Sequence, residues 1–418
     1  MMIYRRRTLM AFKNEPVWFK DLQETVQQEI QNLKMPNLDR FDYHRWNLDQ
    51  IDEMADAESS PIPKDLSKQQ LVSFGDAVHI KLSQEMIDAG LVVEDFKTAF
   101  ENHSDLLQRY FMTKAVRLTE DKLTALNLVR LNLGVFVYVP ANVQITEPLQ
   151  MLMIQNSLAK SNYFGHVLIV TERNSSLKVL QQLETRGDIA NRFHLITEVV
   201  ALENSQVEFT GLDLLAEKTT SYINRRGYLD DAARIDWSIG VFNDGNTIAD
   251  FDSDLKGSGS DSEVKVVALS GGKQRQCIDT RVTNYAPYST GNITQRGVIL
   301  GSSELIFNGI GKIIKGAHGA RANQENRVLM LSDKAHGDAN PILLIDENDV
   351  LAGHAASVGR VDEHQMYYLM SRGIPKKVAQ RLVIRGFLGD VLSKLPSEKL
   401  RNQMIDVIEE KLKNELEN

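Results

Sequence analysis

The chain has 418 residues, a formal net charge of −8 and 25% charged residues. Its length predicts two or three domains with ample apolar material for a core, and its acidic balance, with no basic domain, argues against nucleic acid as the main partner. One cysteine excludes an internal disulfide and a multi-cysteine metal site, and it suits a reducing cytosol.

The first residues carry no pattern of export or membrane insertion. The apolar run that follows three arginines at positions 5–7 is too short for the core of a signal peptide and far too short for a membrane span. We therefore expect a cytoplasmic chain that contacts no membrane.

Residues 1–121 are predicted to form an N-terminal helical region. Apolar residues recur at helical spacing over residues 18–34, and Pro36 ends this segment. Residues 52–67 are predicted to be a linker or a surface loop because they include Pro61 and Pro63. A second helical pattern over residues 83–110 is interrupted near Gly90.

Residues 122–361 are predicted to form a repeat of short β-strands. A small polar turn and an alternating strand recur, with steps of 30, 28, 29 and 41 residues between the first apolar positions. The three near-equal steps favour a β-solenoid with two or three strands per coil, and the long last step leaves room for an inserted loop at residues 271–274. A β-sandwich, in which turns are equally frequent, remains the alternative. The first apolar positions are Leu177, Val207, Ile235, Val264 and Leu305.

The segment 340–373 combines a strand, a run of small residues and a helix. Residues 341–345 are apolar and predict a short buried strand. Residues 350–359 are almost all small, which predicts a tight turn that holds His354 close to the backbone. Asp362 is a candidate N-cap of a helix that Gly373 ends.

Residues 362–418 are predicted to form a C-terminal helical domain. Amphipathic patterns cover residues 375–395 and 396–415. These helices could cap the open end of the solenoid, where exposed strand edges invite aggregation, or they could bind a partner.

Most of the remaining candidate motifs are incomplete. The GIGK sequence at residues 309–312 lacks the P-loop pattern and is interpreted as a sharp turn between strands. Asp250, Asp252 and Asp254 alternate along one strand and could hold calcium, but the segment fails the EF-hand pattern, so a solvated strand face is the preferred interpretation.

His318, His336 and His354 each lie beside glycine or alanine, which leaves the imidazole open to a ligand, a metal or a second protein. No carboxylate or thiolate lies at a familiar metal-ligand spacing from any of them. On pattern alone all three are loop histidines, and Cys277 is a buried small hydrophobe.

Four segments carry a resemblance to the SufB/SufD family, the scaffold proteins of the Suf iron–sulfur cluster assembly machine. The chain looks like the D-type members, most strongly over residues 251–392 and only weakly over the first 100 residues. The segments read LKGSGSDSEVKVVALS, STGNITQRGVILGSSELIFNGIGKI, NRVLMLSDKAHGDANPILLID and GHAASVGRVDEHQMYYLMSRGI.

The resemblance implies a right-handed parallel β-helix between N- and C-terminal helical domains, which agrees with the repeat. It also implies pairing with a SufB-like chain through the β-helix ends and binding of a SufC-type ABC ATPase through the C-terminal helices. Lys394, Lys399 and Lys411 are candidate ATPase contacts because they lie among the apolar residues of these helices.

The resemblance makes His354 a candidate ligand for a nascent cluster at the interface with the SufB-like chain. Some D-type members carry a cysteine two residues earlier, where this chain has Ala352, so the imidazole would act without that thiol. The expected function is a non-catalytic scaffold that holds no stable cluster by itself. Reduced flavin in the complex, a sulfur donor acting through it and a homodimer of the isolated chain remain open.

Two other functions are weighed against this one. A SufB-like chain that itself accepts sulfur is disfavoured by the single cysteine. A polysaccharide-active enzyme on a β-solenoid would use clustered aspartates with calcium and would normally be secreted.

Overall fold

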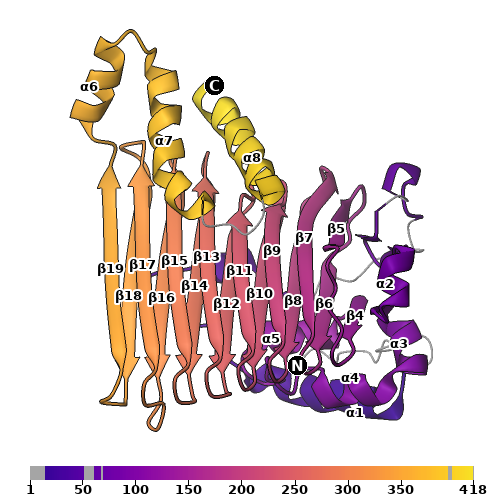
Figure 1. Cartoon of the computed structure of the whole chain (residues 1–418). Helices are drawn as coiled ribbons and strands as arrows, with labels where there is room; N and C mark the ends of the chain where they lie inside the picture. Colours follow the sequence, from indigo (N-terminus) through magenta and orange to yellow (C-terminus); the bar gives the residue numbers. More distant parts are fainter. Residues whose placement is uncertain (1–14, 51–60, 67–68, 394–397, 418) are drawn as a thin grey trace.

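The computed structural model describes residues 15–50, 61–66, 69–393 and 398–417. Over these residues the chain forms a parallel β-helix of about 8 turns, with helices at both ends of the sequence (Figure 1). Each turn contributes one strand to each of two facing sheets, and strands of successive turns pair in parallel. The predicted fold class is confirmed, and the sandwich alternative is wrong because neighbouring strands come from successive turns rather than from hairpins.

The two sheets are defined by their strand orders. Within the described residues sheet A has ten strands, in the order β19 (Leu351–Arg360), β17 (Arg321–Met330), β15 (Thr290–Ile299), β13 (Asp261–Ser270), β11 (Arg234–Val241), β9 (Gln206–Leu214), β7 (Ser176–Gly187), β5 (Leu149–Ser157), β1 (Leu71–Phe74) and β2 (Ala77–Ile80). Over the same residues sheet B has nine strands, in the order β18 (His336–Ile345), β16 (Glu304–Ile313), β14 (Arg275–Asn284), β12 (Thr247–Leu255), β10 (Thr219–Leu229), β8 (Asn191–Ala201), β6 (Tyr163–Thr171), β4 (Leu133–Val139) and β3 (Val92–Asp95).

The long step of the repeat reflects a change of sheet. Leu177, Val207 and Ile235 stack in register on sheet A, and Val264 lies on the next strand of that sheet. Leu305 lies on β16 of sheet B, whereas the residue that pairs with Val264 is Ile293 on β15. The expectation of an inserted loop is therefore wrong, and residues 271–274 form a short turn between β13 and β14.

In one row of stacked turns, each turn contains a residue with a positive φ angle. The backbone N–H of Asn174 donates to the carbonyl of Glu203 in the next turn, and the amide side chains of Asn142, Asn174 and Asn204 form a hydrogen-bonded ladder. Asparagine and glycine tolerate positive φ at such positions. The row contains Asn142, Asn174, Asn204, Ala232, Gly259, Tyr288 and Gly319.

Among its described residues, the N-terminal region contains helices and three strands. The helix predicted over residues 18–34 is confirmed as α1 followed by η1. The expectation of a mostly helical region missed β1, β2 and β3, because their pairing with β5 and β4 decides their conformation. Its described helices are α1 (Val17–Glu29), η1 (Ile30–Asn32), η2 (His44–Trp46), η3 (Lys64–Leu66), α2 (Gln84–Asp88), α3 (Phe96–Asn102) and α4 (Ser104–Tyr110). The segment predicted as a β repeat begins with one more helix, α5 (Lys122–Val129).

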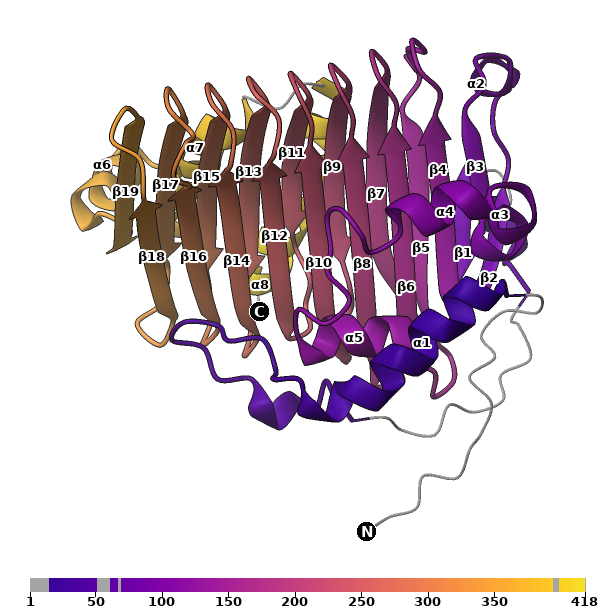
Figure 2. The same cartoon turned by 90° about the horizontal axis from the view of Figure 1, so that it is seen from below.

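The two ends of the chain cover opposite faces of the β-helix. α1 and α5 pack over the outer face of sheet B (Figure 2). The C-terminal helices are α6 (Glu363–Ser371), α7 (Lys376–Leu392) and α8 (Glu398–Glu417), and α7 and α8 bury apolar side chains against sheet A, including Ile384 and Met404. The helices therefore cover a face, and the expectation that they cap the open end is wrong. The predicted start of α6 is confirmed, since the Asp362 carboxylate accepts a hydrogen bond from the backbone N–H of His364.

Candidate functional site

His354 lies on β19, the last strand of sheet A. It pairs in register with Gln324 of β17, and its side chain is exposed. The small residues around it form a full strand, so the predicted tight turn is wrong. Glycine, and to a lesser degree alanine, disfavours strand formation, but pairing with β17 along ten residues outweighs that preference.

The other strand at this end, β18, is an edge as well. It contains Pro341–Ile345 of the predicted buried strand, but Leu344 is 46% exposed and Ile345 is 41% exposed. Leu351 and Val358 of β19 are exposed too, at 64% and 40%. In the part of the chain that the structure describes, β18 pairs only with β16 and β19 pairs only with β17. The β-helix therefore ends in two uncovered strands with apolar side chains. We call these two strands the open end.

His318 and His336 lie away from the row of His354. His318 lies in the turn between β16 and β17, with its ring against Tyr288 at a centroid distance of 5.1 Å. His336 begins β18, and its Nε2 lies 4.0 Å from a carboxylate oxygen of Glu304. These contacts do not bring His318 or His336 together with His354 into one set of metal ligands.

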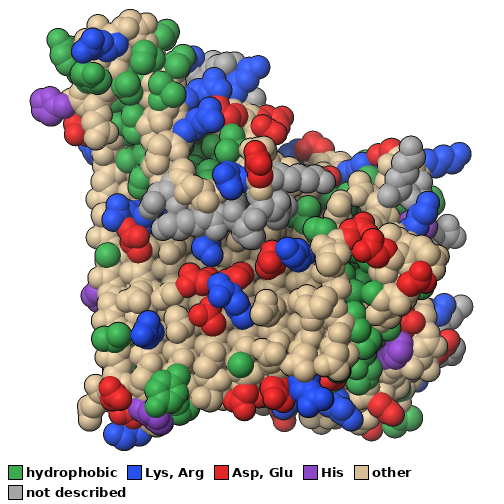
Figure 3. Space-filling view, viewed as in Figure 1, with side chains coloured by type: hydrophobic (Ala, Val, Ile, Leu, Met, Phe, Trp, Pro, Cys, Tyr) green, Lys and Arg blue, Asp and Glu red, His purple; other side chains and the backbone are tan. Residues whose placement is uncertain are grey.

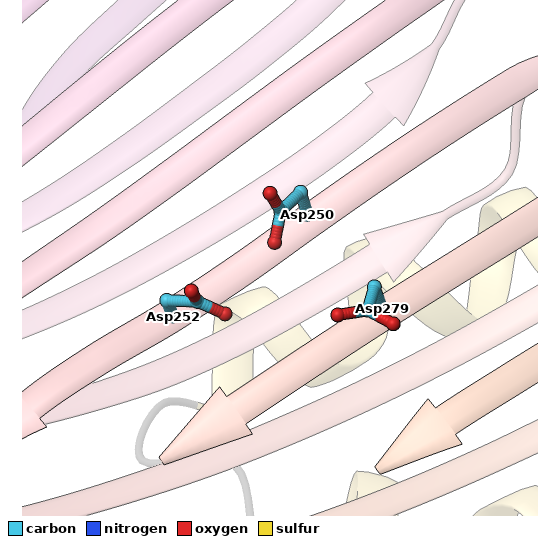
Figure 4. Close-up of side chains that lie close together, drawn as sticks. All are labelled: Asp250, Asp252 and Asp279. Carbon is cyan, nitrogen blue, oxygen red and sulfur yellow. The ribbon is translucent and has the colours of Figure 1, made fainter. Parts of the chain in front are cut away.

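The carboxylates of Asp250, Asp252 and Asp279 converge on the outer face of sheet B (Figure 4). Their oxygens lie within 4.8 Å of one another. Arg226 donates to Asp250 at 2.7 Å and to Asp252, and it also reaches Glu120 at 3.1 Å. The guanidinium already neutralises two of the three carboxylates, so the arrangement is interpreted as an ion-paired cluster.

This cluster overturns the predicted solvated face of residues 250–254. Burial raises the pKa of Asp250, and the neighbouring Arg226 opposes that rise. Asp254 lies apart and pairs with Lys256 at 3.1 Å. Arg226 carries no local signal of this role in the sequence, because only the register of β10 on β12 places it beside the aspartates. The GIGK segment is also reassigned, since it lies within β16 rather than in a turn.

Cys277 is fully buried on the outer face of sheet B, beneath aromatic residues of the N-terminal region such as Phe41 and Tyr43. Burial raises the pKa of its thiol well above the ordinary value. The thiol therefore stays protonated near neutral pH, and the predicted role as a buried small hydrophobe is confirmed.

The three candidate lysines have different positions. Lys394 and the side chain of Lys399 fall outside the described residues. Lys411 lies in α8, where its ammonium group donates to Asp244 at 2.5 Å and the side chain is only 17% exposed. Lys411 therefore anchors α8 to the rest of this chain.

A different surface of the C-terminal region is open. Hydrophobic side chains gather over α6 and α7 (Figure 3). We call this surface the α6–α7 face, and its exposed members are Tyr367, Tyr368, Met370, Val378 and Leu382.

Among the described residues, no helix is both long enough and apolar enough to span a lipid bilayer.

The comparisons with known proteins agree over nearly the whole chain. The model of the SufBD core domain of the SUF iron–sulfur cluster system matches residues 153–387, and the model of the SufBD N-terminal region matches residues 2–151. The chain is 42% identical to the iron–sulfur cluster assembly protein SufD of Bacillus subtilis, over 96% of this chain and 95% of that protein. It is 23% identical to a SufBD family protein of Staphylococcus aureus strain MRSA252, over 94% of this chain and 89% of that protein. The resemblance to the D-type members is thereby confirmed, and the chain belongs to the SufBD family of the SUF iron–sulfur cluster assembly system.

Proposed function

We propose that this chain is a non-catalytic scaffold subunit that assembles iron–sulfur clusters together with a SufB-like chain and a SufC-type ATPase. The observation that carries the proposal is the open end, where two uncovered strands present His354 beside exposed apolar residues. Family membership supports a role in cluster assembly, and the exposed edges of the open end support the proposal that a second chain docks there.

The open end is suited to a second chain with similar strands. An edge strand presents unpaired backbone N–H and C=O groups, which a partner strand can pair while alternate side chains pack against each other. β18 and β19 each offer ten residues for such pairing. A SufB-like chain is the proposed partner, and a second copy of this chain would fit the same edges when the chain is alone.

His354 is the proposed ligand at that interface. A neutral imidazole is a good ligand for iron, and a neighbouring chain would remove His354 from solvent. Clusters are ordinarily held by about four ligands, mostly thiolates. The only cysteine of this chain is buried as a thiol. The nascent cluster is therefore proposed to form on ligands from both chains, and the isolated chain is proposed to hold none stably.

The α6–α7 face is the proposed docking surface for the ATPase. It is apolar and exposed, whereas the apolar residues of α8 that the structure describes face sheet A. Of the three lysines first considered, Lys411 is engaged with Asp244 and is a poor choice for contact with a partner. Lys394 and Lys399 stay candidate contacts on the sequence argument alone.

His354→Ala tests the scaffold proposal. The side chain is exposed, so its loss should change the free energy of unfolding by about 0.5 kcal/mol or less. The complex with the SufB-like chain should still form in size-exclusion chromatography. Growth of a strain that lacks this protein should not be restored, because a ligand is missing where the two chains meet.

His318→Ala and His336→Ala serve as controls, since both histidines have small neighbours but lie outside the row of His354. Both variants should support growth. Growth of the His354→Ala strain at the wild-type rate would contradict the assignment. Failure caused by loss of the complex would make the residue structural.

A further inference from the structure

The interior of the β-helix carries a polar row that runs along its axis. On sheet A the row passes through Gln181, Gly211, Ile239, Val266, Gln295, Asn326 and Ala356, each in register with the next. On sheet B the facing row passes through Thr197, Arg225, Phe251, Thr280, Gly309 and Pro341. Three apolar residues, Ile239, Val266 and Phe251, separate the polar residues of the two rows into two groups. The outer group lies toward the open end, and the inner group lies toward the other end of the β-helix.

The inner group is satisfied by protein atoms. Arg225 is fully buried and donates to both carboxylate oxygens of Asp213, at 3.0 and 2.6 Å, and to Gln181. Gln181 in turn donates to Thr197 across the interior at 3.1 Å. Every charge in this group therefore has a partner.

In the outer group, several buried amide atoms have no hydrogen-bond partner among the described residues. Asn326 is 0% exposed, and within the described chain neither its Oδ1 nor its Nδ2 has a hydrogen-bond partner. Gln324 donates its Nε2 to the carbonyl of Ile342 at 2.8 Å, but its buried Oε1 has no partner in the described residues. Gln295 donates to Thr280 at 2.7 Å and likewise leaves its Oε1 unpaired there. Buried amide atoms nearly always have a protein or water partner.

The unpaired atoms converge on one place. A Cβ atom at Gly309 would lie 2.5 Å from Nδ2 of Asn326 and 2.6 Å from Oε1 of Gln324, so only glycine allows both amides to enter this space. In the last turn of the β-helix, Ala356 stacks on Asn326 and His354 stacks on Gln324. Residues in register on parallel strands share a face at a spacing of about 4.8 Å. Gln324 therefore lies one strand beneath His354, and Asn326 lies two residues further along the same face.

We propose that Asn326 and Gln324 bind ordered water beneath His354, and that this water fixes which ring nitrogen of His354 carries the proton. The row offers a donor from Asn326 and an acceptor from Gln324, and its outer positions carry no charged side chain. A neutral site with a donor and an acceptor suits water better than an ion. Asn326 and Gln324 are thus positioning residues that hold one tautomer and leave the other ring nitrogen for a ligand.

The proposal deepens the proposed function of His354 and rests on it for its biological meaning. Its test does not use cluster assembly. The complete chain is labelled with ¹⁵N-histidine, the signals of His354 are assigned from the His354→Ala variant, and the ring ¹⁵N shifts are recorded at a pH where the ring is neutral. In the wild type we expect the widely separated shifts of a single tautomer.

Asn326→Leu should keep the size of the side chain and lose the water. The expected result is loss of the single tautomer, seen as averaged ring ¹⁵N shifts. Asn326→Thr keeps a donor and an acceptor and should restore the separated shifts. Gln276→Met is the matched control, because Gln276 is also fully buried with both amide atoms unpaired among the described groups, but its row ends at Gly337.

Three results would overturn the proposal. One is an unchanged tautomer in folded Asn326→Leu, and another is an equal change in Gln276→Met. If Asn326→Leu does not fold, a crystal structure of the wild-type chain decides. Water within about 3.2 Å of the Asn326 amide would support the proposal. The third contradicting result is an amide that contacts an ion or protein groups and no water. Normal growth of the His354→Ala strain would contradict the proposed function of His354, but it would not contradict the tautomer measured by NMR.

Discussion

A buried carboxylate shows how a single residue links the N-terminal region to the β-helix. Glu198 of β8 accepts hydrogen bonds from the backbone N–H groups of Met112 at 2.8 Å and Val116 at 3.1 Å. The same carboxylate lies 2.9 Å from Nε2 of His166, and neither side chain is exposed. On the same sheet, the carboxylate of Asp279 lies close to those of Asp250 and Asp252.

Glu198→Ala should lower the free energy of unfolding by about 3 kcal/mol or more, because two backbone donors and one imidazole lose their buried acceptor. Urea denaturation measures the change. Glu208→Ala is the control, since Glu208 is 37% exposed and pairs with Lys178 at 3.3 Å. That surface pair should contribute about 0.5 kcal/mol or less. Equal effects of the two variants would contradict the structural role of Glu198.

Asp279→Asn should stabilise the chain in a pH-dependent manner. Burial, with the charge of Asp252, raises the pKa of Asp279 from 3.8 to about 6. Because the folded-state pKa lies above the unfolded value, the unfolded chain releases this proton first, and the free energy of unfolding falls as pH rises from about 4 to about 6. Asparagine cannot ionise, so the variant should be more stable than the wild type by about 3 kcal/mol above pH 6 and by little below pH 4. Denaturation curves at pH 4, 5, 6 and 7 check this. A gain that is the same at every pH would refute it.

At the scale of elements, the turns between strands limit which residues the β-helix accepts. Gly257 and Gly259 occupy the same turn between β12 and β13 but face different constraints. A Cβ atom at Gly257 would lie 1.9 Å from the backbone nitrogen of Asp231 in the preceding turn. At Gly259 no atom lies within 4 Å, and the constraint is the φ of +67°.

Gly257→Ala should therefore cost more stability than Gly259→Ala. Backbone cannot move aside without separating two stacked turns, so we expect a loss of about 4 kcal/mol or more at Gly257. At Gly259 only the left-handed conformation is penalised, by about 1 kcal/mol. Thermal unfolding of the two variants gives the comparison. A smaller loss at Gly257 than at Gly259 would show that the turns separate easily.

At the scale of the whole molecule, the two kinds of apolar surface left uncovered suggest two partners. The open end belongs to the β-helix, and the α6–α7 face belongs to the helices that pack on sheet A. One chain could therefore hold a scaffold partner and an ATPase at the same time, which is what the proposed complex requires.

Tyr367→Glu combined with Leu382→Glu should abolish binding of a SufC-type ATPase. Both side chains are exposed, at 74% and 44%, so new charges would disrupt a partner contact more than the fold. Pull-down of the ATPase and circular dichroism are measured together. Ile87→Glu is the control, because Ile87 is 52% exposed on α2 of the N-terminal region. Retained ATPase binding in the double variant with intact circular dichroism would place the docking surface elsewhere.

The sequence alone determined the β-helix, α1 and the start of α6. Alternating strands, turn residues at near-equal steps and the Asp362 cap are local features, and local features can be read without knowing what packs against them. The resemblance to the D-type members and the choice of His354 also came from the order of residues.

Only the tertiary structure decided what each residue faces. Residues 351–360 became a strand because β17 pairs with them, and Leu305 proved to lie on the other sheet. Asp250 and Asp279 are far apart in sequence but neighbours on adjacent strands, and the same stacking places Arg226 beside Asp250 and Asp252. The amides of Gln324 and Asn326 carry no local signal in the sequence for the same reason. A parallel β-helix brings together residues about thirty positions apart. A register change of one residue would turn the side chains of a strand to the opposite face.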